Sequence, residues 1–253
     1  MCRQKAIFLI GVIIFALMLI LLPAYADSTD LKASTIISKA IDSYGDVEKW
    51  QAIKGWSATI LMEDYSSGET RIYKHYVRLP DKFRFDVEVN RKGRKEIFQL
   101  IYNAGVTKYL KDGRKVERTS SEMFSILERR FREYRRMQAP TQFKYFNNIK
   151  NEMKLIGKEN VRGRECYILE YRHSDRTKAR VFIDTKTFRS VKQETDKGFN
   201  DKFIEAFLDE QTLKVNGMEF PAVRWVYNDK ELVAKLEYVS ISSDLPDESL
   251  FEF

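Results

Sequence analysis

The sequence has few of the residues on which small or metal-dependent folds rely. Its 253 residues include only 2 Cys, 2 His, 5 Pro and 11 Gly. Two cysteines are too few for a Cys-rich zinc module, and two histidines leave little for a His-rich metal site. The low Pro and Gly content excludes collagen and low-complexity disorder. We therefore expect a globular chain that uses no metal and no cofactor.

The sequence also lacks the motifs of common enzymes. It contains no G-x-S-x-G, no H-E-x-x-H and no phosphate-binding glycine loop. His75 and His173 lie in separate strand-like runs with no carboxylate at ligand spacing, which favours solvated or structural roles. Carboxylate pairs such as Asp64 and Glu69 indicate nothing without a cleft around them. We predict no catalytic residue and no enzymatic activity.

Residues 1–26 have the pattern of an export signal. Lys5 and an earlier arginine precede an uninterrupted apolar run over residues 6–22, and Ala24-Tyr25-Ala26 follows Pro23. A basic start, an apolar stretch and a small-x-small triplet are typical of a secretory signal peptide. We predict cleavage after Ala26 and a periplasmic protein. The alternative is an inner-membrane anchor formed by uncleaved residues 6–22.

Cleavage would change the charge and the cysteine count. Loss of Arg3 and Lys5 lowers the formal charge from +7 to +5. Loss of Cys2 leaves Cys166 without a disulfide partner, so the fold must depend on its own core. Cys166 lies in a strand-like run, where we expect a buried and inert thiol.

The body of the chain, residues 27–253, is dominated by alternation of apolar and polar residues. In residues 83–89 the odd positions are Phe or Val and the even positions are charged, which predicts a half-buried strand. Asp112-Gly113 and Asn216-Gly217 indicate tight hairpin turns. We expect about ten or eleven strands in long antiparallel meanders. No Pro, Gly or Ser-rich linker divides them, so we predict a single domain that is mainly β with some α.

Three segments show helical periodicity instead. Residues 31–44 place an apolar stripe on one face before Gly45, and Asp46 can cap a short second helix through residue 53. Residues 119–137 predict an amphipathic helix in the middle of the chain. Its polar surface is rich in arginine, including Arg129, Arg132, Arg135 and Arg136. This arginine face is either a solvated surface or a contact for a lipid headgroup, a membrane surface or an acidic partner protein. Nucleic acid is not expected outside the cytoplasm.

The apolar faces of this helix and of the neighbouring strands allow two interpretations. They fill a closed core in an ordinary sandwich, or they line an apolar pocket in an open, curved sheet that is covered by helices. The candidate residues are Phe83, Phe85, Phe98, Leu100 and Tyr102 on the strands, and Phe124, Leu127 and Phe131 on the helix.

Several segments, in their order along the chain, resemble the LolA-like outer-membrane lipoprotein-sorting family of periplasmic carriers. The most telling is Arg78-Leu79-Pro80-Asp81-Lys82-Phe83-Arg84-Phe85. Similar segments surround it: Ser43 to Asp46, residues 50–54, residues 157–167, residues 182–184, residues 215–221 and the closing residues 245–253. The resemblance implies a half-open antiparallel β-barrel whose concave face is covered by helices. It also implies a carrier or chaperone that shields the acyl chains of a lipoprotein or lipid during outer-membrane sorting.

The same resemblance suggests partners. A carrier of this family implies an inner-membrane transporter and an outer-membrane acceptor in addition to its lipid cargo. In the carriers an arginine directly before the proline helps to hold the lid, whereas Leu79 occupies that position here. We therefore do not assign that role to Arg78. An alternative is an interaction or sensor module of the same fold, which binds a membrane protein or an anionic membrane through the arginine-rich helix.

Overall fold

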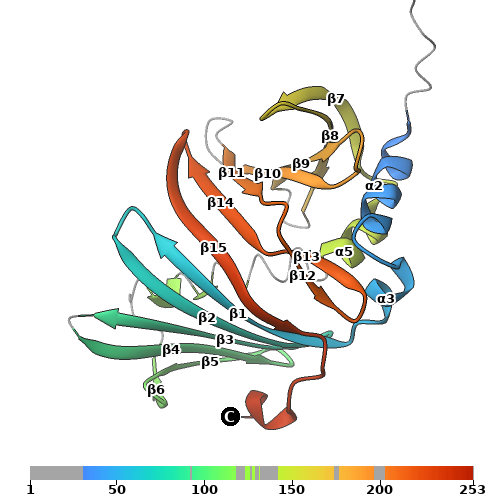
Figure 1. Cartoon of the computed structure of the whole chain (residues 1–253). Helices are drawn as coiled ribbons and strands as arrows, with labels where there is room; N and C mark the ends of the chain where they lie inside the picture. Colours follow the sequence, from blue (N-terminus) through green and yellow to red (C-terminus); the bar gives the residue numbers. More distant parts are fainter. Residues whose placement is uncertain are drawn as a thin grey trace, which may run out of the picture. The chain divides into compact units, whose positions relative to one another are not determined.

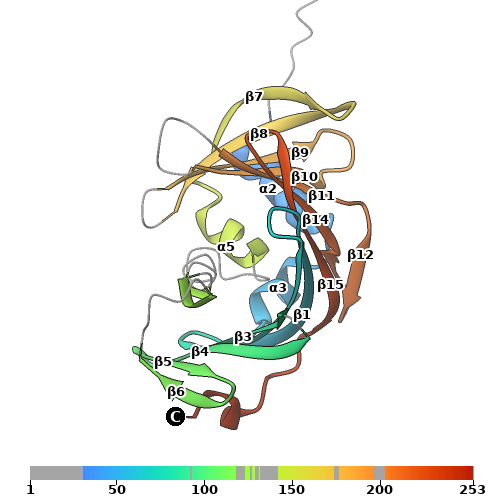
Figure 2. The same ribbon diagram turned by 90° about the vertical axis from the view of Figure 1, so that its left-hand side faces the viewer.

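A computed structural model describes residues 31–91, 93–117, 123–125, 127–128, 131, 142–173, 177–196 and 203–252. Within the unit Lys32–Phe253, one large antiparallel sheet dominates the fold. The described residues place thirteen strands in this sheet, in the order β6-β5-β4-β3-β2-β1-β15-β14-β11-β10-β9-β8-β7. The two outermost strands, β6 and β7, are not paired with each other, so the sheet is curved but not closed (Figure 2).

Two meanders build the sheet. The first runs through β1 (Gly55–Asp64), β2 (Glu69–Arg78), β3 (Lys82–Arg91), β4 (Arg94–Asn103), β5 (Val106–Lys111) and β6 (Arg114–Val116). The second runs through β7 (Lys154–Val161), β8 (Arg164–Arg172), β9 (Lys178–Asp184), β10 (Ser190–Asp196) and β11 (Phe203–Leu208). The chain then forms a separate hairpin, β12 (Thr212–Val215) and β13 (Met218–Pro221), before β14 (Val223–Asn228) and β15 (Glu231–Ser242). The β14–β15 hairpin joins the meanders into one sheet, because β15 pairs with β1 and β14 pairs with β11 (Figure 1).

Tight turns set the register of the hairpins. Asp112 and Gly113 have φ values of 50° and 78°, and Asn216 and Gly217 have 50° and 75°. Positive φ at both central residues matches the right-handed twist of the strands. Both predicted hairpin turns are therefore confirmed.

Four helical elements with both ends among the described residues accompany the sheet: α2 (Ala33–Asp42), α3 (Val47–Ala52), α5 (Gln142–Ile149) and the 3-10 helix η1 (Glu248–Phe251). The apolar stripe of α2 is buried at Ile36, Ile37, Ala40 and Ile41. The Asp46 carboxylate caps α3 by accepting a hydrogen bond from the Glu48 amide. Helix α5 lies inside the curve of the sheet in Figure 2 and packs against α2 and α3.

The fold agrees with the predicted class, a half-open antiparallel barrel with helices on its concave face. It has more strands than the ten or eleven expected. Strand β7 and helix α5 were not predicted, because β7 is an exposed edge strand with little alternation and α5 has only eight residues. The described residues of the expected 119–137 helix are helical at 123–125, 127–128 and 131. Its two ends lie outside the described residues, as do the export signal and its cleavage position.

Candidate functional site

The apolar residues singled out from the sequence gather on one face of β3 and β4. Phe83 pairs with Tyr102 and Phe85 pairs with Leu100 across the two strands. Phe98 follows on the same face, because it is two residues from Leu100. Tyr102 is half-buried, and the other four have at most 4% of their surface exposed.

The partly described 123–131 segment packs against this face through its rings. The centroid of Phe131 lies 4.9 Å from that of Tyr102, 5.6 Å from that of Phe83 and 6.2 Å from that of Phe85. Phe124 contacts Phe98 at 5.7 Å in an edge-on geometry. These distances are typical of favourable aromatic pairs.

Phe124 and Phe131 thus contact the sheet side chains, and Leu127 lies buried on the same segment. We call the eight candidate residues together the apolar cluster. Phe124 and Leu127 are buried, and Phe131 is 9% exposed. The Tyr109 hydroxyl of β5 donates a 2.5 Å hydrogen bond to the Glu128 carboxylate and adds a polar contact at the margin. In this structure the rings contact one another directly, so the cluster is packed.

Two histidines border the concave interior and were not assigned to it from the sequence. His75 is 3% exposed and its ring lies 5.1 Å from that of Phe85. His173 is also buried, and its ring lies 5.2 Å from Tyr171 and 6.1 Å from Tyr145. Both are buried among aromatic rings, so of the two roles expected from the sequence the structural one applies and the solvated one does not.

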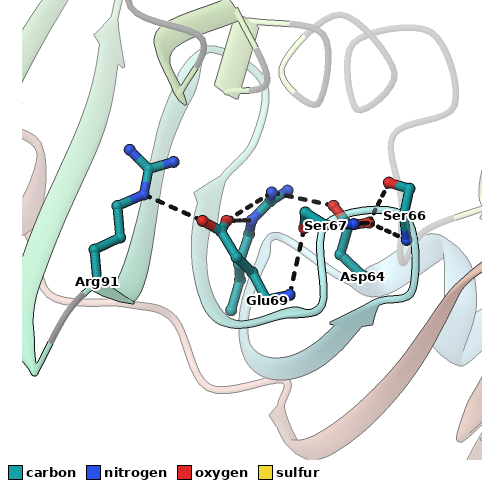
Figure 3. Close-up of polar contacts among 6 residues, drawn as sticks. Asp64, Ser66, Ser67, Glu69 and Arg91 are labelled. Atoms are coloured by element: carbon teal, nitrogen blue, oxygen red, sulfur yellow. Dashed lines mark hydrogen bonds and ion pairs between the residues drawn. The ribbon is translucent and has the colours of Figure 1, made fainter.

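A polar group lies further along β2, where Arg71 shares the buried face of the strand with His75. Figure 3 shows the polar contacts of this group. The buried Arg71 guanidinium lies 3.1 Å from Asp64 and 2.9 Å from Glu69, and Arg91 lies 3.3 Å from the second oxygen of Glu69. Burial raises the pKa of Asp64, but hydrogen bonds from the two serines of the turn and the charge of Arg71 outweigh it and hold the pKa below its usual value. Asp64 and Glu69 thus serve as ion-pair partners that hold Arg71.

A second aromatic group surrounds α5 at the other side of the interior. Phe143 stacks on Tyr44 and meets Trp50 edge-on at 4.8 Å, while Phe146 meets Tyr171 of β8 at 5.4 Å. Trp50 in turn contacts Phe220 of the β12–β13 hairpin at 4.9 Å. This group was not predicted, because its members come from segments that lie far apart in the sequence. The spacing of Phe143 and Phe146 was the available signal.

The arginine side chains expected to form an anion-binding face lie outside the described residues. These are Arg129, Arg132, Arg135 and Arg136. Arg78, which we did not assign to a lid, faces the C-terminal segment instead and donates a 2.8 Å hydrogen bond to the carbonyl of Pro246.

Cys166 is fully buried, as predicted. Burial, with the charge of Asp184, raises the pKa of its thiol to about 11.

The described residues contain no group of three or more His, Cys, Asp or Glu side chains that could hold a metal ion. Among the same residues, no helix is long and apolar enough to cross a membrane.

The same kind of fold, an open antiparallel sheet curved around helices, is found in two solved structures that superpose on this chain. A LolA superfamily protein from Nitrosomonas europaea superposes with a TM-score of 0.50 at 13% identity, over 88% of this chain and 98% of that one. A domain from Vibrio parahaemolyticus, described as a putative outer membrane lipoprotein-sorting protein domain, gives 0.50 at 12% identity, over 87% and 97%. A DUF1329 family protein from Desulfovibrio piger gives 0.48 at 14% identity, over 87% and 97%.

No protein-family model matches the sequence, and no curated protein matches it by sequence comparison. At 12–13% identity the structural likeness to the two proteins with a TM-score of 0.50 shows the fold and nothing finer. The predicted resemblance to LolA-like proteins is therefore confirmed for the fold.

Proposed function

We propose that this protein is a periplasmic carrier that shelters the acyl chains of a lipoprotein or lipid at the apolar cluster. The observation that supports this most is the position of the cluster, between the concave face of an open sheet and a short helical segment. The likeness to a LolA superfamily protein and the signal-like residues 1–26 support the same proposal. A donor in the inner membrane and an acceptor in the outer membrane are the corresponding partners.

The chemistry of the cluster suits this cargo. Each methylene that leaves water contributes about 0.8 kcal/mol, so a long acyl chain needs an extensive apolar surface around it. Phe83, Phe85, Phe98 and Leu100 supply such a surface on the sheet. Since they are held by a regular antiparallel ladder, they form a stiff wall.

The other wall is better suited to move. The 123–131 segment contacts the sheet through side chains, among them the rings of Phe124 and Phe131 and the Tyr109–Glu128 hydrogen bond. Displacement of the segment would therefore leave the hydrogen bonds of the sheet intact. Because the cluster is packed in this structure, an acyl chain would enter by replacing ring contacts of Phe124 and Phe131 with its own.

Uptake of a fluorescent long-chain fatty acid by delipidated protein tests the proposal. We expect saturable binding by the wild-type chain and at least a tenfold loss for Phe131→Asp, because a carboxylate in the cluster would be desolvated. The control is Val239→Asp, which makes the same kind of change at a side chain that is 61% exposed on β15. It should bind like the wild type.

Native mass spectrometry of protein taken from its own periplasm adds an independent measurement. A bound lipid or acylated protein should be released when the sample is denatured. A delipidated wild-type protein that is folded but takes up no fatty acid and no diacylated peptide would refute the carrier function.

A further inference from the structure

Two hairpin turns at one end of the sheet carry an excess of positive charge. The β3–β4 turn is closed by the pair Arg91 and Arg94, and the β5–β6 turn by the pair Lys111 and Arg114. Because β5 pairs with β4, these turns are neighbours at the same end of the sheet (Figure 1). We call the basic side chains of the two turns the basic edge: Arg91, Arg94, Lys95, Lys111, Arg114 and Lys115.

The nearby carboxylates are already engaged with part of this edge. Glu69 pairs with Arg91 at 3.3 Å, Glu88 with Lys95 at 2.7 Å, and Glu96 with Lys111 at 3.1 Å. In the β5–β6 turn, the Asp112 carboxylate accepts a 2.9 Å hydrogen bond from the backbone amide of Ile97.

Three exposed cations of the edge have no ion-pair partner within the described part of the chain. Arg94, Arg114 and Lys115 form no ion pair with any residue that the structure describes, and all three are exposed. Their long side chains extend from turns and are spread over two hairpins, so they suit a broad anionic surface better than a single compact ligand.

The basic edge also adjoins the apolar cluster. The Lys111 ammonium lies 5.0 Å from the centroid of Phe98, whose ring packs on Phe124. A surface that attracted this edge would therefore approach the Phe98 end of the cluster. At the surface of a bilayer, charged headgroups likewise lie next to acyl chains, as the basic edge lies next to the apolar cluster.

We infer that the basic edge binds the surface of a membrane rich in anionic phospholipid. This goes beyond the proposed function, since the charge acts whether or not an acyl chain is carried. The attraction is electrostatic, so it weakens as salt shortens the screening length. Three cations near an anionic leaflet are together expected to strengthen binding about a hundredfold.

Flotation with lipid vesicles tests the inference on the full chain. The measured quantity is the ratio of two affinities, one for vesicles of phosphatidylglycerol and phosphatidylcholine in equal parts and one for pure phosphatidylcholine vesicles. This ratio cancels contributions from the uncharged residues 6–22. We expect the wild-type chain to prefer anionic vesicles by more than tenfold at low salt, and Arg94→Glu/Arg114→Glu/Lys115→Glu to abolish the preference.

A charge-matched control separates the edge from net charge. Lys54, Lys154 and Lys186 are exposed, lie elsewhere on the chain and form no ion pair with described residues. Changing all three to Glu should leave the preference within about twofold of wild type. Both triple variants should keep the wild-type urea midpoint and fatty-acid uptake in solution, so that failure here is distinct from failure of the carrier function.

Three outcomes would overturn the inference. The wild-type chain could show no preference for anionic vesicles, or both triple variants could lose it equally. The wild-type chain could also bind a polyaspartate peptide but not the vesicles, which would assign the edge to an acidic protein. If the triple Glu variant unfolds, the corresponding triple Gln variant replaces it. Removal of the three charges should then lower the preference for anionic vesicles, by less than charge reversal would.

Discussion

Tyr44, two residues beyond α2, stacks on Phe143 of α5 with ring centroids 4.6 Å apart and an interplanar angle of 28°. The Tyr44 hydroxyl also accepts a 3.0 Å hydrogen bond from the backbone amide of Ser190 at the start of β10. Burial raises the pKa of Tyr44 to about 12, so the phenol keeps its proton at neutral pH. The bend between α2 and α3 is thus held to the second meander by Tyr44 and to α5 by Phe143.

Removal of the Phe143 ring should destabilise this junction. Phe143 is buried and contacts both Tyr44 and Trp50. We expect Phe143→Ala to lower the free energy of unfolding by about 3 kcal/mol, since a buried ring is replaced by a cavity. Phe143→Leu retains most of the volume and should cost about 1 kcal/mol. Urea unfolding measures both, and equal losses for the two variants would contradict a packing role.

A side chain at Gly45 should be destabilising for two reasons. Gly45 has φ of +129°, and a Cβ there would lie 2.9 Å from the Gly217 carbonyl oxygen. We expect Gly45→Ala to cost about 3 kcal/mol, because both backbone strain and a clash with backbone are introduced.

Gly113→Ala is the matched control for this change. Its φ is +78°, but a Cβ would meet nothing within 4 Å. Only the backbone preference is lost, at about 1 kcal/mol. If thermal or urea unfolding ranks the two variants in the opposite order, the close approach of the helix bend to the β12–β13 hairpin is not a constraint.

The buried thiol of Cys166 should make the free energy of unfolding decrease with pH in the alkaline range. Its pKa rises on folding from 9.0 to about 11 because of burial. The unfolded chain therefore loses this proton first, and stability falls as pH increases from about 9 to 11, by at most about 1.4 kcal/mol per pH unit. The stability difference between wild type and Cys166→Ala should shrink over this range. A constant difference in urea titrations at pH 7.5, 9 and 10.5 would contradict the assignment.

Much of the fold could be predicted because local chemistry and tertiary packing agree. The alternation of residues 83–89 and the Asp112-Gly113 turn specify strands and register without reference to distant segments. Strand β7 could not be recognised, since one face of an edge strand is solvated and its apolar pattern is weak. Helix α5 could not be recognised either, because its two phenylalanines pack against Tyr44, Trp50 and Tyr171, which are distant in the sequence.

The sequence allowed a prediction of which residues belong to the apolar cluster. It did not allow a prediction of whether they pack together or enclose a cavity. Same-face spacing predicted that Phe83 and Phe85 share one face, and in the structure Phe131 contacts both rings. Whether these side chains enclose a cavity or pack together depends on the distance between the sheet and the segment. The apolar periodicity of the sequence does not give this distance. The ion pairs of Arg71 could not be predicted, because nothing distinguishes Asp64 and Glu69 from the many other carboxylates in the sequence.

Covalent linkage of the segment to the sheet should prevent loading of an acyl chain. Tyr102 and Phe131 face each other with ring centroids 4.9 Å apart. A chain carrying Tyr102→Cys and Phe131→Cys, with Cys2 replaced by Ser, can be bridged by a short bismaleimide, while the buried Cys166 is protected. We expect the bridged protein to bind the fluorescent fatty acid at least tenfold more weakly than the same variant with each thiol capped by N-ethylmaleimide. Equal uptake by the two forms would show that an acyl chain enters without displacing the segment, and would place the binding surface elsewhere on the concave face.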